Sequence, residues 1–146
     1  MLIQHGRFDI ADDLLRVDFA AVHRWLTGSY WSPGIARDRV EHAARHSSLV
    51  VSSWDRASGA QAGYLRVISD QVRLAYLCDV FVSENFRHQG LARAMVSFAM
   101  NHPDHRNIAM WLLATQDAHD VYRGVGFEPL AQPERWMIQR PGQRRL

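Results

Sequence analysis

The sequence predicts an α/β fold in which helices flank a mixed β-sheet. Apolar residues recur at helical spacing in the first part of the chain, and β-type runs follow from Ser48 onward. Helical patterns then alternate with a continuous apolar run at 108–114, which is typical of a strand covered on both faces. The predicted order is two helices, three strands, a helix, a strand, a helix and a closing hairpin. This order fits a mixed sheet and not an all-parallel array.

Two helices are predicted before the first long strand. Asp18 is a favourable N-cap, and apolar side chains follow it at helical spacing: Phe19, Val22, Leu26 and Tyr30. Proline and two glycines in residues 28–34 predict a loop. Residues 36–46 then predict a second helix, which is polar and arginine-rich and therefore expected at the surface.

The remaining elements are predicted from changes of period and from turn residues. Strands are expected at 49–54, 62–69, 72–82 and 108–114. An amphipathic helix is expected at 90–101, and a shorter helix at 117–125. Two last strands, at 128–130 and 135–139, are expected to form the closing hairpin.

The composition bounds the class of protein. A length of 146 residues fits one domain, expected to span 1–146. The single cysteine, Cys78, excludes an internal disulfide framework and a cysteine-rich zinc site. No apolar stretch approaches the ~18 residues of a membrane span, and charges lie where a signal peptide would be apolar. We therefore expect a soluble, cytoplasmic protein without a membrane partner.

The charge pattern is less informative. All 17 positively charged residues are arginines, against 15 acidic residues, and the formal net charge is +2. Arginine suits phosphate and carboxylate ligands because its planar fork donates paired hydrogen bonds. A solvated, arginine-rich surface is the simpler interpretation. The scattered arginines do not by themselves indicate a nucleic-acid partner.

The segment 82–92, VSENFRHQGLA, is the strongest candidate for a binding site. It joins a long predicted strand to a predicted helix, where unpaired backbone N–H groups and the helix dipole favour an anion. Gly90 allows a ligand to approach the backbone, and Ala92 is small enough to keep that approach open. The segment matches neither G-x-x-x-x-G-K-[ST] nor G-x-G-x-x-G. Taken alone, it is also compatible with an ordinary strand-to-helix turn.

Two spaced motifs resemble those of the GNAT superfamily of N-acetyltransferases. They are V-x-x-x-x-R-x-x-G-x-A at 82–92 and A-x-x-x-Y-x-x-x-G-F at 118–127, in the family's order and spacing. The resemblance extends over roughly residues 49–127. It implies a mixed, mostly antiparallel sheet of about six or seven strands with about four flanking helices. It also implies acetyl-CoA as the acetyl donor.

The resemblance implies how acetyl-CoA would be held. In the family, backbone N–H groups of the loop hold the pyrophosphate, and the matching residues here are Arg87, His88, Gln89, Gly90, Leu91 and Ala92. The end of the preceding strand, at Phe81 and Val82, would pair with the pantetheine arm. The guanidinium groups of Arg87 and Arg93 would add charge near the phosphates, or would be exposed without a partner.

The second motif implies a proton donor. Tyr122 matches the family tyrosine whose hydroxyl lies near the cofactor sulfur, so we expect it to protonate the thiolate leaving group. A core tyrosine is the alternative. Many family members have Asn before this helix, where this chain has Thr115 and, nearby, Asp117. Either side chain can cap the helix, so the residue that contacts the pantetheine stays open.

An acceptor amine with a pKa of about 10 must lose a proton before it attacks. Asp79 lies in an otherwise apolar strand, which is costly unless the carboxylate is used or paired. The strand resembles the L-E-D-x-x-V strand of polyamine-type family members, with Cys78 in place of Glu. We expect Asp79 to accept the proton, through water, or to bind the ammonium; an ion pair with an arginine is the alternative. Glu84 and Tyr76 are weaker candidates for the base.

Three other features have two interpretations each. Tyr30 and Trp31 lie where the family's acceptor pocket has its wall, so they are expected to contact the substrate or to anchor their loop. Cys78 is expected to pack rather than to act as a nucleophile, because no histidine adjoins it in sequence. His42 and His46 are four residues apart, but the rest of a zinc motif is missing, so no metal is expected.

These observations predict an acetyl-CoA-dependent N-acetyltransferase that transfers acetyl directly to the primary amine of a small molecule. Acetylation of a protein or an aminoacyl-tRNA is one alternative, and a CoA-binding module without turnover is another. The sequence identifies neither the acceptor nor the oligomeric state, and a homodimer is compatible with it.

Overall fold

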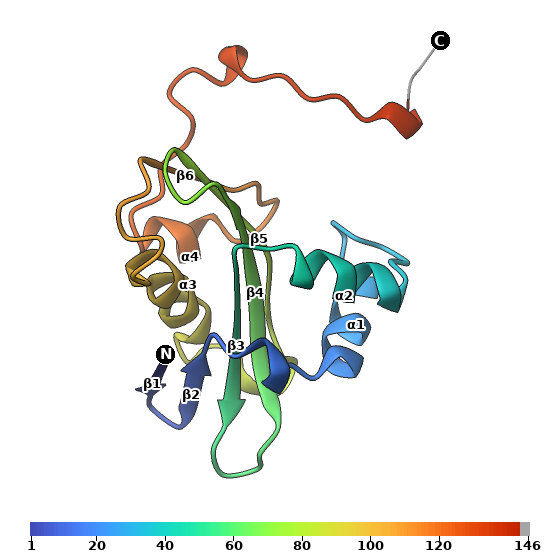
Figure 1. Cartoon of the computed structure of the whole chain (residues 1–146), viewed down its shortest axis with the longest axis vertical. Coiled ribbons are helices and arrows are strands. Elements are labelled where there is room, and N and C mark those ends of the chain that lie inside the picture. Colours follow the sequence, from blue (N-terminus) through green and yellow to red (C-terminus); the bar gives the residue numbers. More distant parts are fainter. Residues whose placement is uncertain (144–146) are drawn as a thin grey trace.

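The computed structural model describes residues 1–143 and contains a six-stranded sheet with helices on both faces (Figure 1). The strands lie in the sheet in chain order: β1 (Leu2–His5), β2 (Phe8–Ala11), β3 (Leu49–Asp55), β4 (Gln61–Ser69), β5 (Leu74–Val82) and β6 (Met110–Leu112). Every neighbouring pair is antiparallel except β5 and β6, which run parallel. The predicted mixed, mostly antiparallel sheet is confirmed.

The helices form a layer on each face of the sheet. α1 (Phe19–Thr27) and α2 (Arg37–Arg45) cover one face, and α3 (Leu91–Asn101) and α4 (His119–Arg123) cover the other (Figure 1). Short 3-10 turns are η1 (Leu14–Arg16), η2 (Glu84–Phe86), η3 (Pro133–Arg135) and η4 (Pro141–Gln143). Asp18 caps α1 as predicted, because its carboxylate accepts a hydrogen bond from the N–H of Ala21. Over residues 1–143, no helix has the length and apolar character needed to cross a membrane.

Two buried cores hold the sheet between these layers. The larger one packs α3 on the sheet and includes Met95 and Val96 of α3 and Leu65 of β4. The smaller one packs α1 and α2 on the opposite face and includes Leu26 of α1 and Tyr64 of β4. Burying one such side chain contributes about 1.5–3 kcal/mol. The larger core includes Ala75 and Leu77, so it holds the first half of β5 in place.

The N-terminal segment differs from the prediction, which placed no strand before α1. β1 and β2 form a hairpin that turns at Gly6 (φ +54°), and β2 continues the sheet by pairing with β3. Each strand has four residues, too few for a clear alternating pattern. Phe8 and Ile10 nevertheless point into the core, and the burial of these two side chains stabilises the hairpin.

The C-terminal segment also differs, because the predicted strands at 128–130 and 135–139 are not formed. After α4 the chain leaves the body of the molecule and contains only the turns η3 and η4 (Figure 1). β6 is likewise shorter than the predicted 108–114. A strand is stabilised by pairing, and no strand of residues 1–143 pairs with the outer edge of β6. The predicted closing hairpin was therefore wrong for this chain by itself.

Candidate functional site

β5 and β6 pair near their beginnings and then separate. Their register runs from Leu74 opposite Met110 to Tyr76 opposite Leu112, whereas β5 continues to Val82. Residues 77–82 thus have no partner strand on this side among residues 1–143. Unpaired backbone groups at a sheet edge can bond an extended ligand.

A β-bulge lies in the same part of β5. Tyr64 pairs with Phe81 and Arg66 with Cys78, so two residues of β5, Asp79 and Val80, lie opposite one residue of β4. The φ angle of Asp79 is +55°, in the left-handed region that Asp adopts more readily than most residues. A bulge bends its strand and increases the local twist, in keeping with the separation of β5 from β6.

A cavity of about 760 Å³ follows the end of β5 and the start of α3, and we call it the α3 cavity. Its wall includes residues 80–82 of β5, the loop that follows and Val121 and Tyr122 of α4. All predicted cofactor-binding residues line it except Gln89, which lies between two lining residues, and Thr115. The structure therefore brings the predicted donor-side residues together.

The loop before α3 presents consecutive backbone N–H groups. Those of residues 87–92 donate to no acceptor within residues 1–143, and helical bonding begins with the N–H of Ala94 on the carbonyl of Gly90 at 3.1 Å. His88 (φ +63°) and Gly90 (φ +74°) are both left-handed. Alternation of this kind turns successive N–H groups towards one point, which forms an anion-binding concavity. The helix dipole of α3 adds to it.

The two arginines of this cavity have intramolecular partners. Arg87 donates from Nε to the carbonyl of Val82 at 3.0 Å, and its guanidinium lies over the ring of Phe81. Arg93 donates to the carbonyl of Asp120 at 3.2 Å and packs on Gly124, where a Cβ would lie 2.7 Å from its guanidinium carbon. Arg93 thus links α3 to α4 through a hydrogen bond and a packing contact.

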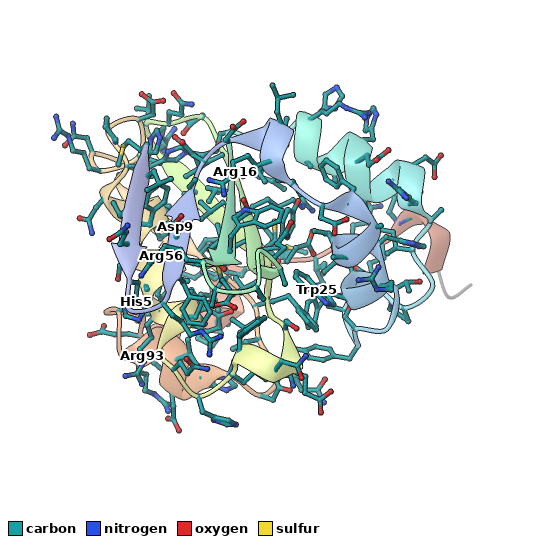
Figure 2. The ribbon with its side chains drawn as sticks, turned by 90° about the horizontal axis from the view of Figure 1, so that it is seen from below. His5, Asp9, Arg16, Trp25, Arg56 and Arg93 are labelled. Carbon is teal, nitrogen blue, oxygen red and sulfur yellow. The ribbon has the colours of Figure 1, made fainter. Side chains whose placement is uncertain are left out.

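The surroundings of the α3 cavity differ on its two sides. Seen from below, Arg93 and His5 lie on the side of α3 and α4, and Trp25 lies on the side of α1 (Figure 2). The ring of Phe81 stacks on Trp25 at 5.2 Å between centroids. The side chain of Phe81 is therefore used in packing, which leaves its backbone as the part available to a ligand.

A second cavity of about 590 Å³ lies under residues 28–34, and we call it the loop cavity. Tyr30 and Trp31 form one wall. The Tyr30 hydroxyl accepts a hydrogen bond from the N–H of Gln116 at 2.8 Å, and Trp31 Nε1 donates to Asp79 Oδ1 at 3.0 Å. Both predicted roles, loop anchor and cavity wall, are compatible with this geometry. Arg140 from the C-terminal segment also reaches this cavity, which no sequence signal indicated.

Asp79 lies in an ion pair, the alternative weighed from the sequence. Its Oδ2 is 2.6 Å from Nε of Arg66, and the two side chains are only 10% and 17% exposed. Each carboxylate oxygen therefore has a donor, since Oδ1 accepts from Trp31. Because Arg66 neutralises it, Asp79 presents little net charge to an acceptor.

Tyr122 lies where the two cavities meet, and it lines both. Burial, together with the neighbouring Tyr30 and Asp117, raises the pKa of its hydroxyl to about 12. The phenol is therefore protonated at neutral pH and can donate a proton or a hydrogen bond.

Asp117 also lines both cavities, is exposed and makes no hydrogen bond within residues 1–143. The hydroxyl of Thr115 accepts a hydrogen bond from the N–H of Ala118 at 3.1 Å and so closes the turn that precedes α4, whereas the carboxylate of Asp117 stays available. The sequence predicted Asp117 only as a residue that binds the cofactor. Its additional position in the loop cavity could be found only from the folded structure.

The structure distinguishes between the weaker candidates for a nucleophile, a base and a metal site. Burial raises the pKa of the Cys78 thiol to about 11, which disfavours the reactive thiolate. Tyr76 lines the loop cavity, whereas Glu84 is exposed in η2 and lines neither cavity. Among residues 1–143, no three His, Cys, Asp or Glu side chains gather where they could hold a metal ion.

Residues 11–127 match the acetyltransferase (GNAT) family. A solved structure of a protein assigned to this family, from Xanthomonas campestris pv. campestris, is 34% identical, with a TM-score of 0.86 over 97% of each chain. A protein assigned as an acetyltransferase from Deinococcus radiodurans R1 is 16% identical, with a TM-score of 0.74 over 97% of this chain and 94% of that one. Glucosamine-6-phosphate N-acetyltransferase from Arabidopsis thaliana is 18% identical, with a TM-score of 0.63 over 91% and 95%. No curated protein matches the sequence.

The chain therefore belongs to the GNAT family of acetyltransferases, and the resemblance found in its two motifs is confirmed. The matched region contains both motifs and all the elements that line the α3 cavity. Family members use acetyl-CoA as the donor.

Proposed function

We propose that this chain is an N-acetyltransferase that uses acetyl-CoA to acetylate a primary amine of a small molecule, and that it works as a single domain. The observation that carries the proposal is the junction at Tyr122. There, a cavity that begins at six unpaired backbone N–H groups opens into a second cavity with aromatic walls.

The residues of the α3 cavity fit acetyl-CoA. A pyrophosphate needs several donors at once, and the N–H groups of residues 87–92 supply them without protein competitors among residues 1–143. The pantetheine arm would bond to the open side of β5 at Phe81 and Val82. There the Val82 carbonyl would exchange its bond from Arg87 for one from the ligand. The freed guanidinium of Arg87 would then be available to the phosphates.

Tyr122 is proposed as the proton donor. Acetyl-CoA supplies an activated acetyl group, and a thiolate leaves when that group is transferred. The hydroxyl of Tyr122 stays protonated because its pKa is about 12, and its place between the cavities suits it to donate to the leaving sulfur.

Two carboxylates of the loop cavity are candidates for the acceptor side. Asp79 remains the predicted base or ammonium anchor, but its ion pair with Arg66 favours a role in orienting Trp31. Asp117 is exposed beside Tyr122 and has no partner within residues 1–143. We therefore propose that Asp117 accepts the amine proton, directly or through water.

A small acceptor is favoured by the size and walls of the loop cavity. Its 590 Å³ lies within the range of about 300–1,000 Å³ typical of small-molecule sites. Residues 28–34 are bonded to both Asp79 and Gln116, so they bridge the cavity rather than leave an open groove for a polypeptide. The fold alone does not decide between acceptors, because two different proteins share it: glucosamine-6-phosphate N-acetyltransferase at a TM-score of 0.63 and Ard1 from Thermoplasma volcanium at a TM-score of 0.70.

The proposal is tested by measuring CoA release from acetyl-CoA in the presence of candidate acceptors. The panel contains polyamines, amino acids and amino sugars, with peptides and aminoacyl-tRNA as the alternatives. We expect turnover with at least one small amine and acetylated product by mass spectrometry. Turnover with peptides or tRNA alone would contradict the small acceptor, and tight CoA binding without any turnover would indicate a binding module.

A further inference from the structure

We propose that the acceptor carries an anionic group, a carboxylate or a phosphate, in addition to its amine, and that Arg140 binds this group. The inference rests on the proposed function and narrows the acceptor to a small molecule with one primary amine and one anion. It is carried by the charges that remain free in the loop cavity and by their position relative to Tyr122.

The loop cavity presents one free charge of each sign. Among residues 1–143, three formally charged side chains line it: Asp79, Asp117 and Arg140. Asp79 is paired with Arg66 at 2.6 Å, so this carboxylate contributes little net charge. Asp117 and Arg140 are both exposed, and neither forms an ion pair within residues 1–143. One free carboxylate and one free guanidinium complement a ligand that carries both signs.

The two free charges differ in their position relative to the donor. Asp117 and Tyr122 line both cavities, so they lie at the junction where the acetyl group would arrive. Arg140 lines the loop cavity but not the α3 cavity, so it lies away from this junction. It is therefore also separate from the backbone N–H groups of residues 87–92 that would hold the pyrophosphate. An acceptor with its amine beside Asp117 can direct its anionic group to Arg140.

The chemistry of Arg140 and its surroundings suits such a ligand. A guanidinium donates paired hydrogen bonds to a carboxylate or a phosphate. Pro141 follows directly and restricts the backbone of Arg140 towards the extended region, which reduces the conformational entropy lost on binding. Tyr30 and Tyr76 line the same cavity, and their rings would pack on the carbon atoms between the amine and the anion.

A polyamine fits this distribution of charge less well. It carries several ammonium groups, whereas Asp117 is the one free carboxylate among the lining residues of the described chain. Cys78 adds no negative charge to the wall at neutral pH, because burial raises the pKa of its thiol to about 11. A second ammonium group near Arg140 would be repelled by the guanidinium.

The first experiment compares pairs of acceptors that differ in the anionic group. Phosphoethanolamine is paired with ethanolamine, and several amino acids are each paired with their amides. Rates are compared at equal concentrations of free amine, because the two members of a pair differ in amine pKa. We expect kcat/KM to be about 10–100-fold higher for the anionic member, as for a hydrogen bond between charged groups. The phosphate and carboxylate pairs show which of the two anions is preferred.

The second experiment assigns the preference to Arg140. Arg140→Gln should raise KM for the anionic acceptor by about 10–100-fold, and leave KM for its neutral partner and the affinity for CoA unchanged. Arg140→Lys keeps the charge but not the paired donors, so it should restore part of the loss. Arg135→Gln is the matched control, because it removes the same charge from the same segment and Arg135 does not line the loop cavity.

The outcomes separate this inference from the proposed function. Equal kcat/KM within every acceptor pair would overturn the anionic acceptor while acetylation of a small amine stands. A polyamine preferred to every anionic acceptor, or an Arg140→Gln variant with an unchanged KM for the anionic acceptor, would overturn it in the same way. Absence of turnover with every amine would instead overturn the proposed function, and this inference with it.

Discussion

At the scale of single residues, Tyr122 carries the sharpest expectation. Tyr122→Phe keeps the ring and its edge-on contact with Phe127 but removes the proton donor. We expect kcat to fall by about 10²–10⁴ with little change in acetyl-CoA affinity. Steady-state kinetics and calorimetry check the two parts. Unchanged turnover would mean that the hydroxyl has no chemical role.

The two carboxylates of the loop cavity should respond differently to amide substitution. Asp79→Asn leaves Arg66 without its countercharge in a mostly buried place, so we expect a loss of about 2–3 kcal/mol of stability. Asp117→Asn changes an exposed side chain and should alter stability by no more than about 0.5 kcal/mol. The acetylation rate of Asp117→Asn should fall at neutral pH and recover in part at high pH, where the free amine is abundant.

The measurements for this pair are thermal unfolding and the dependence of kcat/KM on pH. A rate defect in Asp79→Asn that recovers at high pH, with no defect in Asp117→Asn, would show that Asp79 is the general base. The stability loss at Asp79 serves as the internal control, because it is expected whatever the chemistry.

The sequence found most of the candidate residues but not their partners. Each motif lies within a short stretch of sequence, so its spacing alone identifies Arg87, Gly90 and Tyr122 without knowledge of the fold. The Arg66–Asp79 pair depends on the register of β4 with β5 and on a bulge that shifts it by one residue. Alternation along a strand cannot reveal such a shift, and so the partner of Asp79 could be named only as some arginine.

At the scale of elements, the loop before α3 makes a clear prediction. Gly90→Glu places a carboxylate at the unpaired N–H groups and should abolish detectable CoA binding by calorimetry. The φ of +74° adds a backbone strain of about 1–2 kcal/mol. Gly59→Glu is the matched control, because Gly59 has a φ of +75° in the open turn between β3 and β4 and does not line the α3 cavity.

The two Gly→Glu variants should thus lose similar stability, while only Gly90→Glu loses CoA. Equal CoA affinity in both would refute the anion site at residues 87–92.

Elements with a strong local signal were predicted well, and those that depend on a partner were not. α1 has a capping residue and a regular apolar stripe, and it lies where expected. β1 and β2 are stabilised by the neighbouring β3, and the C-terminal strands lack a neighbour within residues 1–143. In both cases tertiary pairing, and not the local pattern, decides whether a strand forms.

At the scale of the whole molecule, acids whose pKa burial raises, among them the half-buried Tyr122 and Cys78, should limit stability in alkali. Burial raises the pKa of Tyr122 from 10 to about 12, and that of Cys78 from 9 to about 11. Above the ordinary values, the unfolded chain loses these protons before the folded chain does. The free energy of unfolding should therefore fall from about pH 9 upward, by at most about 2–3 kcal/mol for each group.

This decline is checked by thermal unfolding between pH 8 and 11. Tyr122→Phe should lose less stability over the upper part of the range than the wild type does. A melting temperature that stays constant to pH 11 would contradict the raised pKa values.

The position of Trp31 has a spectroscopic consequence. Its indole lies on the wall shared by the α3 and loop cavities, and its N–H is bonded to a carboxylate. Tryptophan emission depends on solvent contact and on nearby charge, so a ligand in either cavity should shift the fluorescence of the native chain. The other four tryptophans lie outside this wall, and Trp31→Phe should remove the signal while the chain still folds. An unlabelled titration can thus report donor and acceptor occupancy from one built-in optical probe.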